Sequence, residues 1–221
     1  MVILADCQRI FSMNTFGGIV EGITDFSIIN SILIGYFNDS KIDINPISPQ
    51  SFKASSNYDK VFKSCKPEKL KRAFLANKYI IIHVDTDISE NYFGISHYED
   101  DKPLSPQQLI DKVAEKFKQQ MGEEFYSQYG HRIIFAIAVH SIECWLFPLL
   151  ASDDKSAETE NCCQTLEKTV PSFRKKYEYY QEITKKYRNH NELLKLYPKN
   201  PSLKIFIEEL ASRNIEISEE S

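Results

Sequence analysis

The stretch YIIIHVDTD, residues 79–87, carries the strongest signal for the fold. Residues 79–84 form a dense β-branched run, which is typical of a strand that helices cover on both faces. The run stops at Asp85, and a second acidic residue, Asp87, follows two positions later. Because strands buried on both faces belong to parallel sheets, this stretch predicts an α/β domain.

Other segments extend this prediction in both directions along the chain. Residues 132–139 form a second dense apolar run, so we expect another buried strand there. Ile19 and Val20 lie between glycines and indicate a short buried strand. Residues 41–48 alternate apolar and polar positions, and Pro46 and Pro49 point to an edge strand or a strand end.

Helical periodicity separates these strands. Apolar residues spaced three and four apart predict helices over residues 24–37, 57–77 (interrupted near Pro67), 104–125 and 141–150, with a loop over residues 88–106. Residues 173–190 and 201–213 are further predicted helices, and Asn200-Pro201 is a typical helix start. We therefore expect a Rossmann-like, mostly parallel sheet over residues 1–150. Residues 151–221 form a helical, basic extension packed on this core.

Composition and charge limit the functional classes. The 221 residues are 42% hydrophobic and carry a net charge of −4, so the whole chain is not an electrostatic nucleic-acid binder. The five cysteines show no zinc-site spacing, and reduced thiols in the cytoplasm are the natural interpretation. No apolar run is long enough to cross a bilayer, and the N-terminus does not resemble a secretory signal. We expect a cytoplasmic protein without membrane contact.

Three acidic sites follow predicted strands or begin the helices after them. Glu21 and Asp25 follow the first strand, Asp85 and Asp87 follow the strongest strand, and Glu143 follows the strand at residues 132–139. Ligands of open parallel sheets bind beyond the carboxyl ends of the strands. Carboxylates crowded together repel one another unless a cation compensates them, and such oxygen ligands suit Mg²⁺ or Mn²⁺. The pattern predicts a divalent-metal site.

Each acidic residue also has a purely structural interpretation. Glu21 and Asp25 could simply favour the start of a helix. An Asp-x-Asp pair is common in loops, and Glu143 could be a solvated helix residue. His140 could be a strand-end histidine without a ligand. These alternatives stay open for each residue taken alone. Chance explains less well that all three acidic sites occur together, each at the end of a strand.

A resemblance to a known family is carried by these motifs. Val20-Glu21-Gly22-x-x-Asp25, followed by Ile-His-Val-Asp85-x-Asp87, resembles the TOPRIM domain of topoisomerases, bacterial primases and the overcoming-lysogenisation-defect nucleases. The block from His140 to Leu146, with Glu143 and Trp145, resembles small stand-alone TOPRIM-like proteins linked to phage defence. The resemblance covers roughly residues 16–150.

This resemblance implies roles for the acidic residues. Glu21 would be a metal ligand or general base, Asp85 and Asp87 metal ligands, Asp25 an auxiliary acid, and Glu143 a ligand for a second ion. It implies a Mg²⁺- or Mn²⁺-dependent nuclease in bacterial antiphage defence, acting on DNA or RNA. A separate ATPase or sensor protein would be a partner, and a homo-oligomer stays open. No tyrosine is placed for strand passage, and the zinc- and helicase-binding parts of a primase are absent from this sequence.

A basic segment follows residue 163. Between residues 163 and 204, ten Lys and Arg stand against four Glu, an excess of six positive charges interleaved with tyrosines. Basic side chains bind phosphates and aromatic rings stack on bases, so we expect a nucleic-acid surface here. Its candidate contacts are Arg174, Lys175, Lys176, Lys185, Lys186 and Arg188. The spacing of Phe173, Tyr177, Tyr180 and Ile183 equally fits a helix face turned to the core.

Two other functions remain open. Asp85-x-Asp87-x-Ser89 after a strand also resembles the nucleophile motif of haloacid-dehalogenase phosphatases, with Asp85 as the nucleophile. That motif normally follows the first strand of its domain, and it gives Glu21 and Glu143 no role. A regulatory or toxin-partner subunit with a vestigial site is the non-enzymatic alternative.

Overall fold

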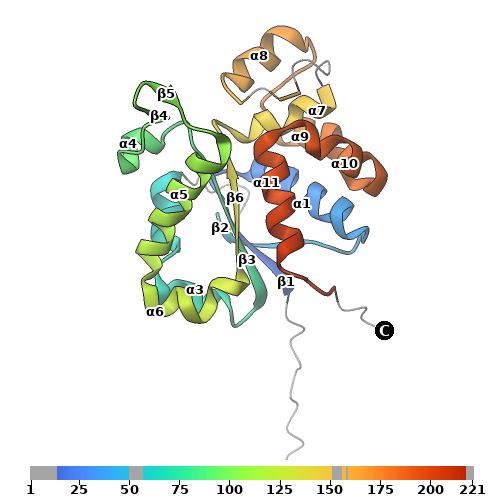
Figure 1. Cartoon of the computed structure of the whole chain (residues 1–221). Coiled ribbons are helices and arrows are strands. Elements are labelled where there is room, and N and C mark those ends of the chain that lie inside the picture. The colour runs from blue at the N-terminus through green and yellow to red at the C-terminus, as the bar shows by residue number, and fades with distance from the viewer. Residues whose placement is uncertain (1–13, 50–56, 151–155, 158, 218–221) are drawn as a thin grey trace, which may run out of the picture.

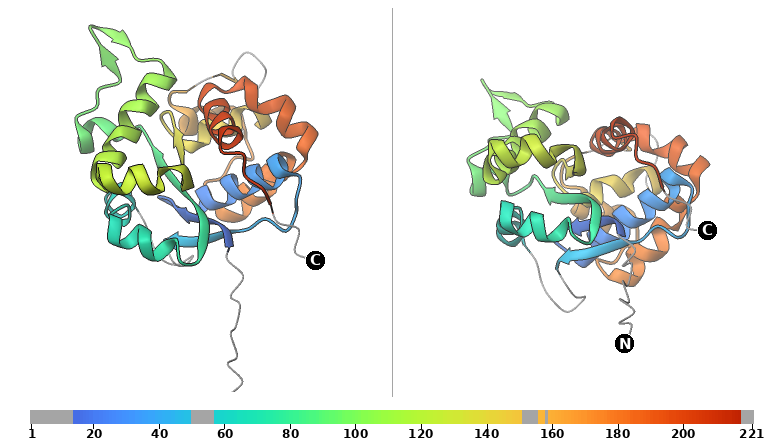
Figure 2. Two further views of the ribbon diagram at one scale, coloured as in Figure 1. Left: turned by 60° about the horizontal axis from the view of Figure 1, so that its bottom comes forward. Right: turned by 90° about the horizontal axis from the view of Figure 1, so that it is seen from below.

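The computed structural model describes residues 14–49, 57–150, 156–157 and 159–217, which form one parallel sheet between two layers of helices (Figures 1 and 2). The strands are β1 (Asn14–Ile19), β2 (Ile44–Ser48), β3 (Asn77–Asp85) and β6 (Ile133–Ala138). Their order is β2-β1-β3-β6, and every neighbouring pair is parallel. The predicted α/β class with a parallel sheet is confirmed.

The central position of β3 explains its apolar sequence. It pairs with β1 on one side and with β6 on the other, so both of its edges are hydrogen-bonded. Residues 80–84 are all buried, and so is every residue of β6. The chain enters β1 at the bottom of Figure 1, so the carboxyl ends of the parallel strands lie towards the top.

Two hydrophobic clusters lie on opposite faces of the sheet. One joins Ile81 and Ile134 to α1 and the C-terminal helices, and the other joins Ile80 and Ile82 to the helices between β2 and β6. The first layer contains α1 (Ile23–Phe37), α8 (Cys162–Thr169), α9 (Tyr177–Ile183), α10 (His190–Leu196) and α11 (Pro201–Ser212). The second contains α2 (Tyr58–Ser64), α3 (Pro67–Ala73), α5 (Pro106–Met121) and α6 (Glu123–Tyr129).

Several predicted boundaries need correction. The predicted loop 88–106 contains the short helix α4 (Ser89–Phe93) and a hairpin of β4 (Tyr98–Glu99) and β5 (Lys102–Pro103). The predicted helix 104–125 ends at Met121 because Gly122 adopts a φ of 81°, and α6 follows. The segment 141–150 is η2 (Ile142–Leu146) followed by α7 (Phe147–Leu150), and the segment 173–190 divides into α9 and η4 (Thr184–Arg188). The remaining short elements are η1 (Gly130–Arg132) and η5 (Tyr197–Lys199).

The chain after residue 150 packs closely on α1. A Cβ built on Gly35 would lie 1.8 Å from the backbone oxygen of Tyr187, so only glycine permits this approach of α1 to η4. His190 Nδ1–H donates to the Gly35 oxygen at 2.7 Å. On α11, the Phe206 ring stacks on Trp145 with centroids 5.3 Å apart. The boundary at residue 150 stays a prediction, although one hydrophobic cluster crosses it.

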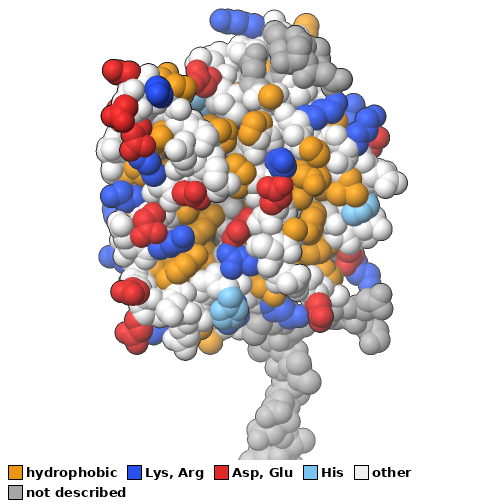
Figure 3. All heavy atoms as spheres, in the orientation of Figure 1, with side chains coloured by type: hydrophobic (Ala, Val, Ile, Leu, Met, Phe, Trp, Pro, Cys, Tyr) orange, Lys and Arg blue, Asp and Glu red, His pale blue; other side chains and the backbone are white. Residues whose placement is uncertain are grey.

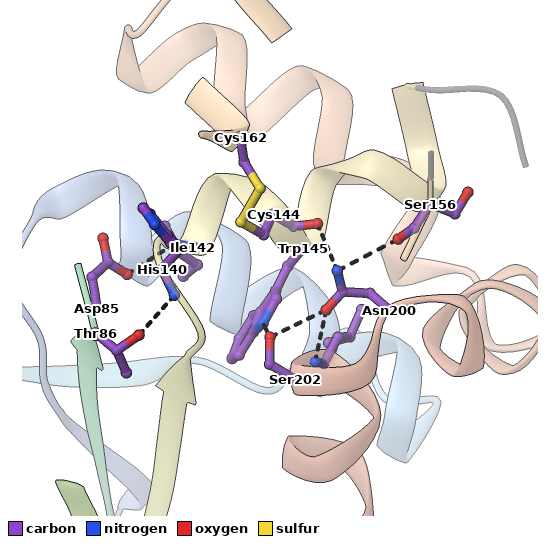
Figure 4. The surroundings of a disulfide bond; sticks show 11 residues. Asp85, Thr86, His140, Ile142, Cys144, Trp145, Ser156, Cys162, Asn200 and Ser202 are labelled. Carbon is purple, nitrogen blue, oxygen red and sulfur yellow. Dashed lines mark hydrogen bonds between the residues drawn. A yellow bond between two sulfur atoms is a disulfide. The ribbon is translucent and has the colours of Figure 1, made fainter. Parts of the chain in front are cut away.

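The cysteines differ from the expectation. Cys144 and Cys162 form a disulfide between η2 and the start of α8 (Figure 4). The prediction of reduced thiols is therefore wrong for these two residues, because η2 brings Cys144 next to a cysteine 18 positions away. Cys65 and Cys163 are free thiols. Disulfides persist in oxidising surroundings and are rare in the cytoplasm, so this one does not support the expected cytoplasmic location, which stays a prediction. Within the described residues, no helix is long and apolar enough to span a membrane.

Candidate acidic active site

The candidate site lies where the strand order changes direction. From β1 the chain continues to β2 on one side, whereas β3 lies on the other side of β1. The carboxyl ends of β1 and β3 therefore form a topological switch point, the usual ligand position in open α/β sheets. Glu21 follows β1, and its Oε1 accepts a hydrogen bond from the backbone N–H of Asp85 at 2.9 Å. The structure thus brings Glu21 to the end of β3.

The ends of β3 and β6 are joined by side-chain hydrogen bonds. Asp85 Oδ1 accepts from the Ile142 N–H at 2.8 Å, and Thr86 Oγ1 accepts from the His140 N–H at 2.7 Å (Figure 4). His140 adopts a positive φ of 65°, which turns the chain from β6 into η2. Its carbonyl accepts from the N–H groups of Thr86 and Asp87. These bonds fix the backbone that carries Asp85, Asp87 and Glu143.

Asp25 lies in the first turn of α1 and is buried. Its Oδ2 accepts from the Gly22 N–H at 2.7 Å, and its Oδ1 accepts from the Thr24 hydroxyl at 3.2 Å. This arrangement satisfies the free N–H at the helix start, as the structural interpretation of Asp25 predicted. Both carboxylate oxygens of Asp25 already accept hydrogen bonds. Asp25 is therefore better suited to influence the charge of the site than to bind a metal directly.

His83 is a member of the site that the motif analysis did not identify. It is fully buried on β3, and its Nδ1 lies 2.6 Å from the Ala136 carbonyl, so Nδ1 carries the hydrogen. Its Nε2 lies 3.4 Å from Asp85 Oδ1 and 3.6 Å from Asp25 Oδ2. Residues two apart on a strand face the same side, so a polar residue at position 83 of an apolar run was the available signal.

Burial and like charge dominate the electrostatics of the cluster. Burial raises the pKa of Glu21 to about 7, opposed by the Asp85 N–H and His83 and reinforced by Asp25 and Asp87. Burial likewise raises the pKa of Asp85. Asp87 is exposed, and partial desolvation and the Glu143 charge raise its pKa. For His83, burial lowers the pKa, but the adjoining Asp85 and Asp25 carboxylates outweigh it and raise the pKa. The cluster therefore retains protons at neutral pH, as crowded anions do without a cation.

Glu143 has partners of its own. It is 3% exposed, and its Oε1 accepts from the Tyr180 hydroxyl at 2.8 Å and from Lys175 Nζ at 3.0 Å. Burial raises the pKa of Glu143, but the Lys175 charge and the hydrogen bonds from Lys175, Tyr180 and Ser141 together outweigh it and leave the pKa below its ordinary value. The charge of Glu143 also raises the pKa of Asp25 and of Asp87. Glu143 thus borders the cluster with one oxygen already paired.

Two of the tyrosines interleaved with the basic residues predicted to bind nucleic acid are buried. Tyr180 and Tyr187 are buried, so neither ring can stack on a base. The core-facing alternative holds for Phe173 and Tyr180, whereas Tyr177 and Ile183 are half-buried. Lys185 pairs with Glu182, Arg188 Nε donates to Ser31 Oγ, and Arg174 donates to backbone oxygens. Lys176 is the N-cap residue of α9. On the face shown in Figure 3, basic and acidic side chains are intermixed.

The donor chemistry bears on the expected metal. In the described part of the chain, no group of three or more His, Cys, Asp and Glu side chains is arranged to hold an ion as it stands. Glu21, Asp85 and Asp87 are nevertheless carboxylates within electrostatic range of one another: the Asp87 charge raises the pKa of Glu21, and the Glu21 charge raises the pKa of Asp85. A hard divalent cation is what such a set of oxygens favours. The residues fit Mg²⁺ or Mn²⁺ in chemistry, with side-chain adjustment needed to close around it.

Comparison with known proteins does not add to this picture: no family model, no curated protein and no solved structure matches the chain.

Proposed function

We propose that this protein is a Mg²⁺- or Mn²⁺-dependent nuclease that hydrolyses phosphodiester bonds of DNA or RNA. The observation that supports the proposal most directly is the hydrogen bond between Glu21 and the backbone of Asp85 at the switch point of the sheet. The role in bacterial antiphage defence, the cytoplasmic location and the ATPase or sensor partner come from the sequence and the family resemblance.

Three carboxylates would hold the metal, namely those of Glu21, Asp85 and Asp87. When bound, Mg²⁺ or Mn²⁺ supplies a Lewis acid that neutralises the developing charge on the phosphodiester oxygens. The bond from the Asp85 N–H to Glu21 Oε1 leaves the second carboxylate oxygen of Glu21 for a further contact. His83, held by the Ala136 carbonyl, is a positioning residue because it fixes the charge beside Asp85.

The pKa of Glu21 suits proton transfer at neutral pH. Burial raises this pKa to about 7, close to the value at which a general base works best. As a general base, the alternative to its role as a ligand, Glu21 would accept the proton of the attacking water. Lys175, whose Nζ pairs with Glu143, also lies within electrostatic range of Asp85 and would balance the phosphate charge. Neither role requires the aromatic residues of α9.

The haloacid-dehalogenase alternative accounts for less of the site. It assigns Asp85 as a nucleophile and leaves Glu21 without a function, whereas Glu21 is hydrogen-bonded to the Asp85 backbone. It also leaves unexplained why His83 and Asp25 lie beside Asp85. Trapping of beryllium fluoride on Asp85 would favour that alternative. Absence of Mn²⁺ binding by calorimetry would favour the non-catalytic one.

The test is cleavage by the purified chain. Plasmid DNA and single-stranded RNA are incubated with Mg²⁺ or Mn²⁺, with a chelator as the blank. Wild type should cut, and Glu21→Gln and Asp85→Asn should each lower the rate by about 100-fold or more, as loss of a general base or a metal ligand does. Glu115→Gln, an acid-to-amide change on α5 outside the cluster, is the matched control and should cut like wild type. Equal cutting by all four proteins would sink the proposal.

A further inference from the structure

A groove lies on the face of the sheet opposite to α1, the helix that carries Asp25. It occupies about 700 Å³ between the edge strand β2 and the helices α2 and α3. Four cationic side chains line it: Lys60, Lys63, Lys69 and Arg72. All four residues are exposed. Among the described residues that line the groove, none is acidic and none is aromatic.

The charge of this segment differs from that of the whole chain. Residues 57–78 contain seven Lys and Arg against two Asp and Glu, an excess of five positive charges in a protein with a net charge of −4. Among the cations of the groove, Lys63 pairs with Asp59 at 2.7 Å, and both side chains are exposed. Exposed pairs of this kind contribute little, so Lys63 can exchange its partner for a phosphate.

One end of the groove reaches the carboxyl end of β2, at the same edge of the sheet as the acidic cluster, and the other reaches Asn77 at the start of β3. Ser48, at the end of β2, lines the groove, and its carbonyl accepts from the Val20 N–H at 2.8 Å. Val20 immediately precedes Glu21 in the chain. A ligand that extends along β2 in the groove would therefore be led towards the carboxyl ends of β1 and β3. The groove and the cluster have opposite charge, which suits a polyanion that needs a cation for cleavage.

We propose that this groove binds the sugar-phosphate backbone of a nucleic acid and leads it to the acidic cluster. The proposal rests on the nuclease function. Exposed Lys and Arg, with no aromatic residue among the described residues of the lining, favour phosphate contacts over base stacking, so recognition is independent of sequence. Among the described lining residues there is no ring on which the base of a single nucleotide could stack, and this favours a polymer. The groove replaces the segment 174–188 as the main nucleic-acid surface.

A pair of double variants on one helix tests the proposal. Lys69→Gln/Arg72→Gln removes two cations that line the groove, and Lys66→Gln/Lys71→Gln removes two from α3 and its cap that do not. Both variants carry the same change in charge. Binding of a fluorescent single-stranded oligonucleotide is measured by anisotropy in a chelator, where no cleavage occurs. The groove variant should bind about ten-fold or more weakly, and its salt slope should fall by about 1.4, as expected for two lost phosphate contacts.

The outcomes separate this proposal from the nuclease function. If both variants bind equally, the groove is not the binding surface, and cleavage by wild type still decides the nuclease function independently. If only the groove variant loses binding while wild type never cleaves, the groove binds nucleic acid and the nuclease function fails. If Arg174→Gln/Lys186→Gln weakens binding more than the groove variant does, the segment 174–188 is the main surface and the proposal is overturned.

A small anion would give a different result. Inorganic phosphate is titrated into wild type and into the groove variant by calorimetry at constant ionic strength. Weak or undetectable binding to both proteins, together with tight oligonucleotide binding to wild type, supports a polymer. Tight binding of phosphate to wild type alone, with equal oligonucleotide binding by both variants, would show a site for a free anion and overturn the proposal.

Discussion

Lys175 keeps a negative charge inside the fold. Its Nζ lies 3.0 Å from Glu143 Oε1, and Glu143 is almost fully buried whereas the Lys175 side chain is 58% exposed. A buried carboxylate without a partner destabilises the fold. The ion pair therefore matters mainly because removing Lys175 would leave the Glu143 charge buried and unpaired. This makes the pair a test of the electrostatics at the edge of the acidic cluster.

Lys175→Met should lower the free energy of unfolding at pH 7 by about 1 to 3 kcal/mol, because it leaves the Glu143 charge buried without its cation. The pKa of Glu143 lies below its ordinary value in the folded chain. The stabilisation is therefore present above the ordinary pKa and is lost as pH falls through the folded value. Urea unfolding at a series of pH values should show the difference shrinking towards acid pH.

Lys185→Met is the matched control. Lys185 pairs with Glu182, and both side chains are more than half exposed, so its loss should change stability little at any pH. A Lys175→Met chain as stable as wild type at pH 7, or a deficit that persists unchanged at acid pH, would contradict the assigned role of Lys175.

At the scale of residues, the sequence predicts which acids follow strands but not what they contact. Glu21, Asp85 and Asp87 are recognisable because each interrupts an apolar pattern where a strand ends. The partners of Glu143 are Lys175 and Tyr180, and the approach of Tyr180 depends on how α9 packs on α1. No periodicity in the sequence encodes that packing. His83 was hidden for a related reason, since a single polar residue in a buried strand shows no partner until the neighbouring strand is placed.

At the scale of elements, α1 and η4 approach each other through Gly35. A methyl group there would meet the Tyr187 carbonyl, a backbone atom that cannot rotate away. Gly35→Ala should therefore destabilise the fold by about 1 to 3 kcal/mol through overpacking, although alanine is intrinsically the better helix residue by about 1 kcal/mol. Chemical denaturation followed by circular dichroism measures the change.

Asn30→Ala in the same helix separates the two effects. The Asn30 side-chain oxygen is buried without a hydrogen bond, so this change removes an unsatisfied group and gains helix propensity. It should leave stability equal or slightly higher. If Gly35→Ala behaves like Asn30→Ala, the close approach of α1 and η4 is not a constraint.

Elements with a strong apolar period were predicted well, and those without one were not. The strands at residues 79–84 and 132–139 were evident because burial on both faces demands continuous apolar sequence. The helix 57–77 was correctly interrupted near Pro67, since Pro67 is the first residue of α3. The hairpin of β4 and β5 was missed because all four of its residues are exposed, so no apolar alternation marks it.

At the scale of the whole molecule, the C-terminal helices complete the core of the sheet. Trp145 donates its indole N–H to Ser202 at 2.8 Å and stacks on Phe206, and α11 lies against β6. A chain ending at residue 150 would expose this face of α1 and β6 to water. Buried apolar area supplies most of the stability of a domain, so the loss should exceed what the remainder can offset.

We therefore expect the fragment 1–150 to lack cooperative unfolding. Heating it should give a gradual loss of ellipticity and binding of a hydrophobic dye at room temperature, whereas the full chain should melt in one transition. Addition of a separately produced fragment 151–221 is the control, and it should restore part of the cooperativity. A fragment 1–150 that melts sharply by itself would show that the helical segment is an independent addition.

The disulfide between Cys144 and Cys162 closes a covalent ring around residues 145–161. A protease that cuts the backbone once inside this ring cannot release either half, so the nicked protein migrates as one species until a reductant separates its two polypeptides. Glu143 and Lys175 then belong to different polypeptides, yet the sulfur bridge tethers both within the same particle. After a single cut in this ring, Glu143 and Lys175 would therefore still be held in one covalently linked molecule.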